Sequence, residues 1–279
     1  MNLLVYSHCL SPRLRYVFKQ IFNSILKVNV SFTESKDFFL KTDSPRISYT
    51  HRPISDELFF KSTDFLFQKS ILNQDIVVFK HESVSCFFSC EESCFPFDPF
   101  ATSFFMLSRY EEYLPHIKDK FGRFEAKESF AFKNKFLNKP VVDIWANMIK
   151  EKILNHYPDF SFPAKKFHFL NTIDIDNAYA YLGKGFLRNL GGFARDVIRK
   201  KSPLERLKVL LHLKPDPYDK FELLLLWNKK YNLDTTFFFL LADYGLNDKN
   251  VPITSKKLVQ QIKKVSDYCD VGLDINCKY

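Results

Sequence analysis

Short apolar segments with alternating polar positions, separated by turn-forming residues, fill most of the first 80 residues. They predict strands at residues 2–6, 28–33, 46–50, 57–61 and 75–80. Ser11 and Pro12 mark a helix start, and apolar side chains then recur every three or four residues as far as Leu26. Further helices are predicted at 99–113 and 142–156. Residues 1–160 are therefore predicted to form an α/β domain.

The segment 157–163 contains two prolines, which interrupt regular structure and favour a linker. The pattern beyond it differs and predicts a second domain over residues 165–279. An apolar strand ending at Asp176 comes first. Then follow a helix at 218–231, a strand at 235–241, a helix at 255–268 and a strand at 271–275. Alternating strands and helices predict parallel β-strands joined by crossover helices.

The composition excludes a disordered chain, because 46% of the 279 residues are hydrophobic and 17% are aromatic. No apolar run is long enough to span a membrane, and no signal peptide is recognisable, so we expect a cytoplasmic protein. The six cysteines are then expected to be reduced. Cys86, Cys90 and Cys94 are spaced by four, but no histidine or fourth cysteine accompanies them, which favours ordinary thiols over a metal site.

The net charge of +9 is concentrated in residues 184–214, which contain nine basic residues and only two acidic ones. Such a segment can bind an anionic surface or polymer. Its apolar residues also recur at helical spacing, so a solvated basic face on an amphipathic segment is the favoured interpretation. We do not expect a nucleic-acid partner.

The strongest chemical signal is an apolar strand over residues 167–177 that ends in Asp174 and Asp176. Residues i and i+2 of a strand share a face, so the two carboxylates are expected to lie together at the end of a parallel sheet. Such a pair needs a cation, a shared proton or a basic partner. The alternative is that one acid caps a helix and the other is solvated.

These residues carry a family resemblance. The segments 172–177 (Thr-Ile-Asp-Ile-Asp-Asn), 236–240 (Thr-Phe-Phe-Phe-Leu) and 271–273 (Val-Gly-Leu) resemble the NodB-type polysaccharide deacetylases, carbohydrate esterase family 4. The segments 107–113 and 139–145 are similar to an uncharacterised domain that precedes the deacetylase module in a bacterial subgroup. The resemblance implies a (β/α) barrel of parallel strands that binds a divalent metal, usually zinc, and hydrolyses N-acetyl groups of a glycan.

The resemblance also implies roles for individual residues. Asp174 matches the catalytic base and Asp176 a metal ligand. Asp274 stands where the family has a metal-binding histidine, and a carboxylate there shifts the preference away from zinc. Tyr179 and Tyr181 follow the acidic pair and can either stack on a sugar ring or pack against the scaffold.

The second domain has room for only part of a barrel, since a closed one takes ~200 residues or more. We therefore expect an incomplete (β/α) barrel after the N-terminal α/β domain, in a truncated deacetylase relative that is not catalytically competent. Its divalent metal is either retained or lost. The alternative is a non-catalytic interaction or scaffold protein that uses its first domain or residues 184–214.

Overall fold

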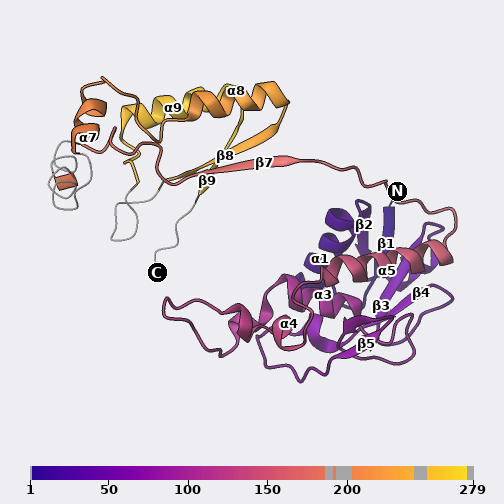
Figure 1. Cartoon of the computed structure of the whole chain (residues 1–279). Coiled ribbons are helices and arrows are strands. Elements are labelled where there is room, and N and C mark those ends of the chain that lie inside the picture. The colour runs from indigo at the N-terminus through magenta and orange to yellow at the C-terminus, as the bar shows by residue number, and fades with distance from the viewer. Residues whose placement is uncertain (1, 186–190, 193–202, 242–249, 275–279) are drawn as a thin grey trace. The chain divides into compact units, whose positions relative to one another are not determined.

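A computed structural model describes residues 2–185, 191–192, 203–241 and 250–274 (Figure 1). The chain divides into two compact units, residues 1–165 (unit 1) and 166–279 (unit 2). Each unit has its own hydrophobic core.

Unit 1 is built on a four-stranded parallel sheet with the order β2-β1-β3-β4. Its strands are β1 (Asn2–Tyr6), β2 (Asn29–Thr33), β3 (Arg46–Thr50) and β4 (Leu58–Lys61). A separate hairpin consists of β5 (Phe79–His81) and β6 (Val84–Cys86). Its α-helices are α1 (Pro12–Lys19), α2 (Lys36–Lys41), α3 (Pro99–Leu107), α4 (Phe130–Lys133) and α5 (Val141–His156).

Helix α1 begins where the sequence predicts, because Ser11 caps it and Pro12 occupies its first turn. The Ser11 Oγ accepts a hydrogen bond from the Leu14 amide at 3.1 Å. The apolar face continues beyond Lys19 in a π-helical turn (Gln20–Ile25). The predicted amphipathic segment is therefore helical throughout, with a change of winding in its second half.

Aromatic rings dominate the core of unit 1, as expected for a chain with 32 phenylalanines. The rings of Phe18 and Phe100 stack with centroids 3.8 Å apart, and Tyr49 packs edge-on against Phe100. Trp145 of α5 is fully buried in the same core. This packing joins helices α1, α3 and α5 to the sheet.

A buried carboxylate, Asp98, connects α3 to the sheet. It caps α3 by accepting hydrogen bonds from the amides of Phe100 and Ala101. Its other oxygen accepts from the Tyr49 hydroxyl at 2.6 Å and from the amide of Thr63 at 2.8 Å. Burial raises the pKa of both Asp98 and Tyr49.

Strands β3 and β4 are parallel although only residues 51–57 connect them. The buried Glu57 organises this short connection, since its carboxylate accepts hydrogen bonds from the Ser48 hydroxyl and from the amides of Ile54 and Ser55. Burial opposes ionisation, but these donors outweigh it and hold the pKa of Glu57 below its usual value.

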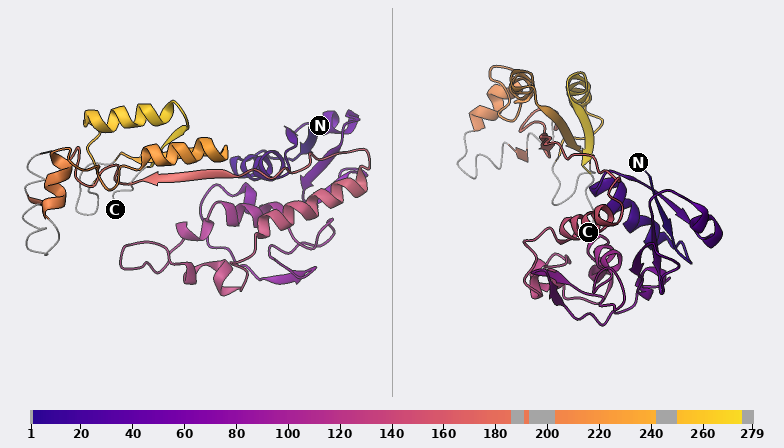
Figure 2. Two further views of the ribbon diagram at one scale, coloured as in Figure 1. Left: turned by 45° about the horizontal axis from the view of Figure 1, so that its top comes forward. Right: turned by 90° about the vertical axis from the view of Figure 1, so that its right-hand side faces the viewer.

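Unit 2 contains a three-stranded parallel sheet in the order β7-β8-β9. Its strands are β7 (Leu170–Ile175), β8 (Asp234–Leu240) and β9 (Asp270–Asp274), and its helices are α7 (Pro203–Leu210), α8 (Phe221–Tyr231) and α9 (Lys256–Ser266). Helices α8 and α9 lie on the same face of the sheet (Figures 1 and 2). The chain moves in one direction across the sheet, from β7 to β8 to β9, so two crossover connections of the same hand place their helices on the same face.

The core of unit 2 lies between that face and the two helices. Phe237 and Phe239 of β8 point into it and meet Phe221 of α8. The mixed α/β class with parallel sheets is thus confirmed. Within the described ranges, no helix has both the length and the apolar character required to cross a bilayer.

Candidate functional site

The two acids predicted as a pair lie at the carboxyl end of β7. Asp174 is the fifth residue of this six-residue strand, and Asp176 follows the strand directly. Ile173 and Ile175 pack against the core, so alternation directs Asp174 to the opposite face. Both acids are exposed. The sequence thus located them correctly relative to the strand.

The third predicted acid, Asp274, is the last residue of β9 and is paired in register with Leu240 of β8. Gly272 lies two residues earlier, and the ring of Phe238 covers it on the face away from the helices. Asp174 is in register with Phe238. Alternation therefore places Asp174 and Asp274 on the same face of the sheet.

Strand β8 separates the two acidic strands, so their backbones are about 10 Å apart, given ~4.8 Å between neighbouring strands. Among the described residues, no three His, Cys, Asp or Glu side chains form a group that could hold a metal ion. The structure thus brings Asp174, Asp176 and Asp274 to one edge and does not gather them around a single point. A zinc centre does not fit this all-carboxylate donor set, whereas oxygen ligands suit harder cations.

The two tyrosines after the acidic strand have different environments. Tyr179 is only 1% exposed and packs against Phe221, with the Lys257 ammonium 5.0 Å from its ring centroid. Of the two roles that the sequence left open for Tyr179, stacking on a sugar ring or packing against the scaffold, its burial favours packing, because its ring is part of the core. Tyr181 is half-buried, and the Arg206 guanidinium lies 4.6 Å from its ring centroid.

A carboxylate that the sequence analysis did not identify, Asp216, holds the loop carrying these tyrosines. It is 2% exposed and accepts hydrogen bonds from the amides of Ala180, Tyr181 and Leu182 at 2.8 to 3.1 Å. The Tyr218 amide is a fourth donor, at 3.0 Å. Burial acts to raise the pKa of Asp216, but these donors outweigh it and lower the pKa below its usual value. The only local signal in the sequence is that prolines flank this acid.

The cysteines spaced by four are free thiols. Burial raises the pKa of Cys86 and of Cys90 to about 11, and that of Cys94 to about 12. These groups are therefore protonated at neutral pH and are poor metal ligands.

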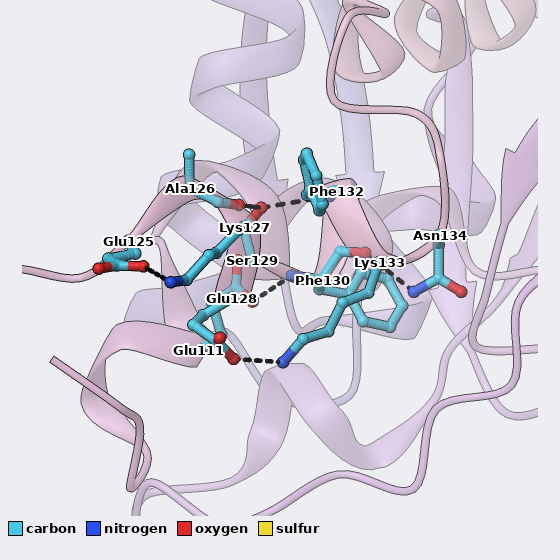
Figure 3. A network of polar contacts seen from close by, with 10 residues as sticks. All are labelled: Glu111, Glu125, Ala126, Lys127, Glu128, Ser129, Phe130, Phe132, Lys133 and Asn134. Carbon is cyan, nitrogen blue, oxygen red and sulfur yellow. Dashed lines mark hydrogen bonds and ion pairs between the residues drawn. The ribbon is translucent and has the colours of Figure 1, made fainter. Parts of the chain in front are cut away.

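The segment 107–113, which carried part of the resemblance, has a structural role in unit 1. Arg109 and Glu112 form an ion pair. Glu111 accepts a hydrogen bond from the Phe130 amide at 2.6 Å and so anchors the first turn of α4, which Ser129 caps (Figure 3). Burial raises the pKa of Glu111.

The basic segment 184–214 lies partly outside the described residues, which include 184–185, 191–192 and 203–214 of it. Within them, Lys214 pairs with Glu205 at 2.7 Å, and Arg206 stacks on Tyr181. The favoured interpretation of the whole segment, a solvated basic face, and its alternative, an anionic-surface partner, both stay predictions.

A family model described as a family of unknown function, DUF7033, matches residues 3–158. No curated protein and no solved structure matches the chain. The matched residues make up more than half of the chain and nearly all of unit 1. The chain therefore belongs to the DUF7033 family.

Proposed function

We propose that the protein is a polysaccharide deacetylase-like protein whose unit 2 keeps an acidic, cation-binding edge without hydrolysing N-acetyl groups by itself. The observation that carries this proposal is the placement of Asp174, Asp176 and Asp274 at the carboxyl ends of β7 and β9, two strands of one parallel sheet that are separated by β8. Catalytic and binding residues of α/β folds occupy this edge.

The chemistry of the three acids supports distinct roles. Asp174 can accept a proton from a water molecule beside it, the step that a general base performs in amide hydrolysis. Asp176 and Asp274 supply carboxylate oxygens, the ligands that a hard divalent cation such as Mn²⁺ or Mg²⁺ prefers. The separation of the acidic strands by β8 is the reason to propose binding without turnover.

The test is thermal unfolding of the chelator-treated full chain with added Mn²⁺, followed by far-UV circular dichroism. Because a ligand that binds only the folded state stabilises it, Mn²⁺ should raise the unfolding temperature. Asp176→Asn should abolish the shift, whereas Asp270→Asn, at the opposite end of β9, should retain it. No shift, or an unchanged shift in Asp176→Asn, would refute the cation-binding edge.

Activity is tested separately with N-acetylated chitooligosaccharides, Mn²⁺ or Zn²⁺, and a measurement of released acetate. We expect no release above the background without protein. Release that disappears in Asp174→Asn would instead establish a working deacetylase and contradict the proposed lack of turnover.

A second candidate function, an interaction module in unit 1, is favoured by a surface pocket at the amino-terminal ends of the sheet strands. It has a volume of about 540 Å³. Its lining combines apolar and polar side chains, including Pro45, Tyr157, Phe160 and Asp43. This size falls within the range typical of ligand pockets. Under this alternative alone, neither Mn²⁺ stabilisation nor acetate release is expected.

A further inference from the structure

Two histidines meet at the carboxyl edge of the sheet in unit 1. His8 follows the end of β1 by two residues, and His51 directly follows β3. Strands β1 and β3 are neighbours at the centre of the sheet. The chain leads from β1 to β2 at one edge of the sheet and from β3 to β4 at the other edge. Open parallel sheets bind ligands at such a reversal of strand order.

Their imidazole rings lie side by side. The ring centroids of His8 and His51 are 5.0 Å apart, with an angle of 35° between the ring planes. Phe67 packs against both, at 4.5 Å from His8 and 6.2 Å from His51. This contact restrains both rings from one side, while the His51 side chain stays 54% exposed. The pair is thus held together and accessible.

A carboxylate accompanies the pair. Asp64 Oδ1 lies 3.7 Å from the Nε2 atom of His51. Histidines that bind metals commonly direct their second ring nitrogen to such a carboxylate, which orients the ring. Burial and the neighbouring His51 lower the pKa of His8, although Asp64 acts in the opposite direction.

We propose that His8 and His51 together bind one divalent transition-metal ion, with Asp64 orienting His51 from behind. Imidazole nitrogen favours Zn²⁺, Ni²⁺ and Cu²⁺ over the harder cations proposed for unit 2. No group of three His, Cys, Asp or Glu side chains that could hold a metal occurs among the described residues, so the two imidazoles would be the protein's ligands and the other coordination positions would stay open. The open positions are what a metal needs in order to bind or polarise a small ligand. This site belongs to the DUF7033 domain and is independent of the proposed function of unit 2.

The experiment is isothermal titration calorimetry with Ni²⁺ on the chelator-treated full chain carrying Asp176→Asn, which removes the cation site proposed for unit 2. His8→Gln and His51→Gln should each abolish binding, because one remaining imidazole is a weak ligand. The matched control is His156→Gln, which removes an exposed imidazole that packs on Tyr157. This variant should bind Ni²⁺ like the Asp176→Asn chain without a histidine substitution, which separates this site from unit 2.

A second measurement locates the metal without a mutation. Zn²⁺ should shift the ring ¹⁵N resonances of two histidines in long-range ¹H–¹⁵N spectra, and assignment should identify these as His8 and His51. Binding that persists in both glutamine variants, shifts confined to other histidines, or no binding at all would overturn the proposal.

Discussion

Asp216 shows how much one buried carboxylate organises in unit 2. Its oxygens receive four backbone N–H groups, three of them from the consecutive residues 180–182. Successive amides pointing at one anion form a concave binding arrangement, and here a side chain of the same molecule fills it. The loop after the acidic strand is therefore held by a residue far away in the sequence.

We expect Asp216→Asn to destabilise unit 2 by about 2–4 kcal/mol at neutral pH, because hydrogen bonds to a buried charged group are lost or weakened. Urea unfolding followed by far-UV circular dichroism measures this change. Asp219→Asn is the control, because Asp219 is close in sequence and its pKa is raised by burial. An equal effect of both substitutions would contradict the role assigned to Asp216.

The same carboxylate predicts a pH dependence. The pKa of Asp216 is lower in the folded chain than its ordinary value of about 3.9, so the unfolded state binds its proton more readily. Its contribution to stability is thus fully present above about pH 3.9 and is lost as the pH falls through the lowered folded pKa. The free energy of unfolding of Asp216→Asn should therefore fall less steeply than that of the unmodified chain as the pH is lowered from neutral to the lowered pKa of the folded state.

At the scale of the element, the packing of β9 on β8 depends on a residue without a side chain. A Cβ atom at Gly272 would lie 2.5 Å from the Cε1 atom of Phe238. The two residues are in register on adjacent strands. The aromatic ring thus lies over the glycine and covers the backbone next to Asp274.

Gly272→Ala should destabilise unit 2 by about 1–3 kcal/mol, because the new methyl group forces the Phe238 ring to move. In a Phe238→Ala background the same substitution should be neutral or stabilising, since alanine suits a strand better than glycine. Urea unfolding of the four proteins gives a double-mutant cycle. A coupling energy near zero would show that the ring moves freely.

At the scale of the whole molecule, two separate cores predict two unfolding transitions. The core of unit 1 is the larger and contains most of the buried aromatic rings. Unit 2 leaves many large apolar side chains exposed, among them Leu170, Leu226 and Leu273. Because stability grows with buried apolar area, unit 2 should unfold at the lower urea concentration.

The two tryptophans allow a direct test, since Trp145 is in unit 1 and Trp227 in unit 2. In the Trp227→Phe variant, fluorescence reports unit 1 alone because Trp145 is the remaining tryptophan. The urea midpoint of the fluorescence transition in this variant should be higher than the midpoint of the first transition seen by circular dichroism. A single transition with coincident midpoints from both probes would mean that the two units unfold cooperatively.

Regular elements with strong local signals were predictable, and those without such signals were not. The strand predicted at 46–50 and the helix predicted to start at Pro12 agree with the structure. The strand expected at 75–80 is confined to Phe79–His81, which pairs with β6. The turn between them places Glu82 and Ser83 at positive φ, a geometry that usually selects asparagine or glycine. Tertiary packing therefore overrides local preference there.

The sequence by itself determined the α/β alternation, the boundary near residue 160 and the position of Asp174 and Asp176 at a strand end. Periodicity and turn residues are local properties, so they can be recognised without coordinates. Only the tertiary structure decided that Tyr179 is buried, that Asp216 holds residues 180–182, and that His8 lies beside His51. These relations join residues distant in sequence, and strand order and packing, which local patterns do not encode, bring them together.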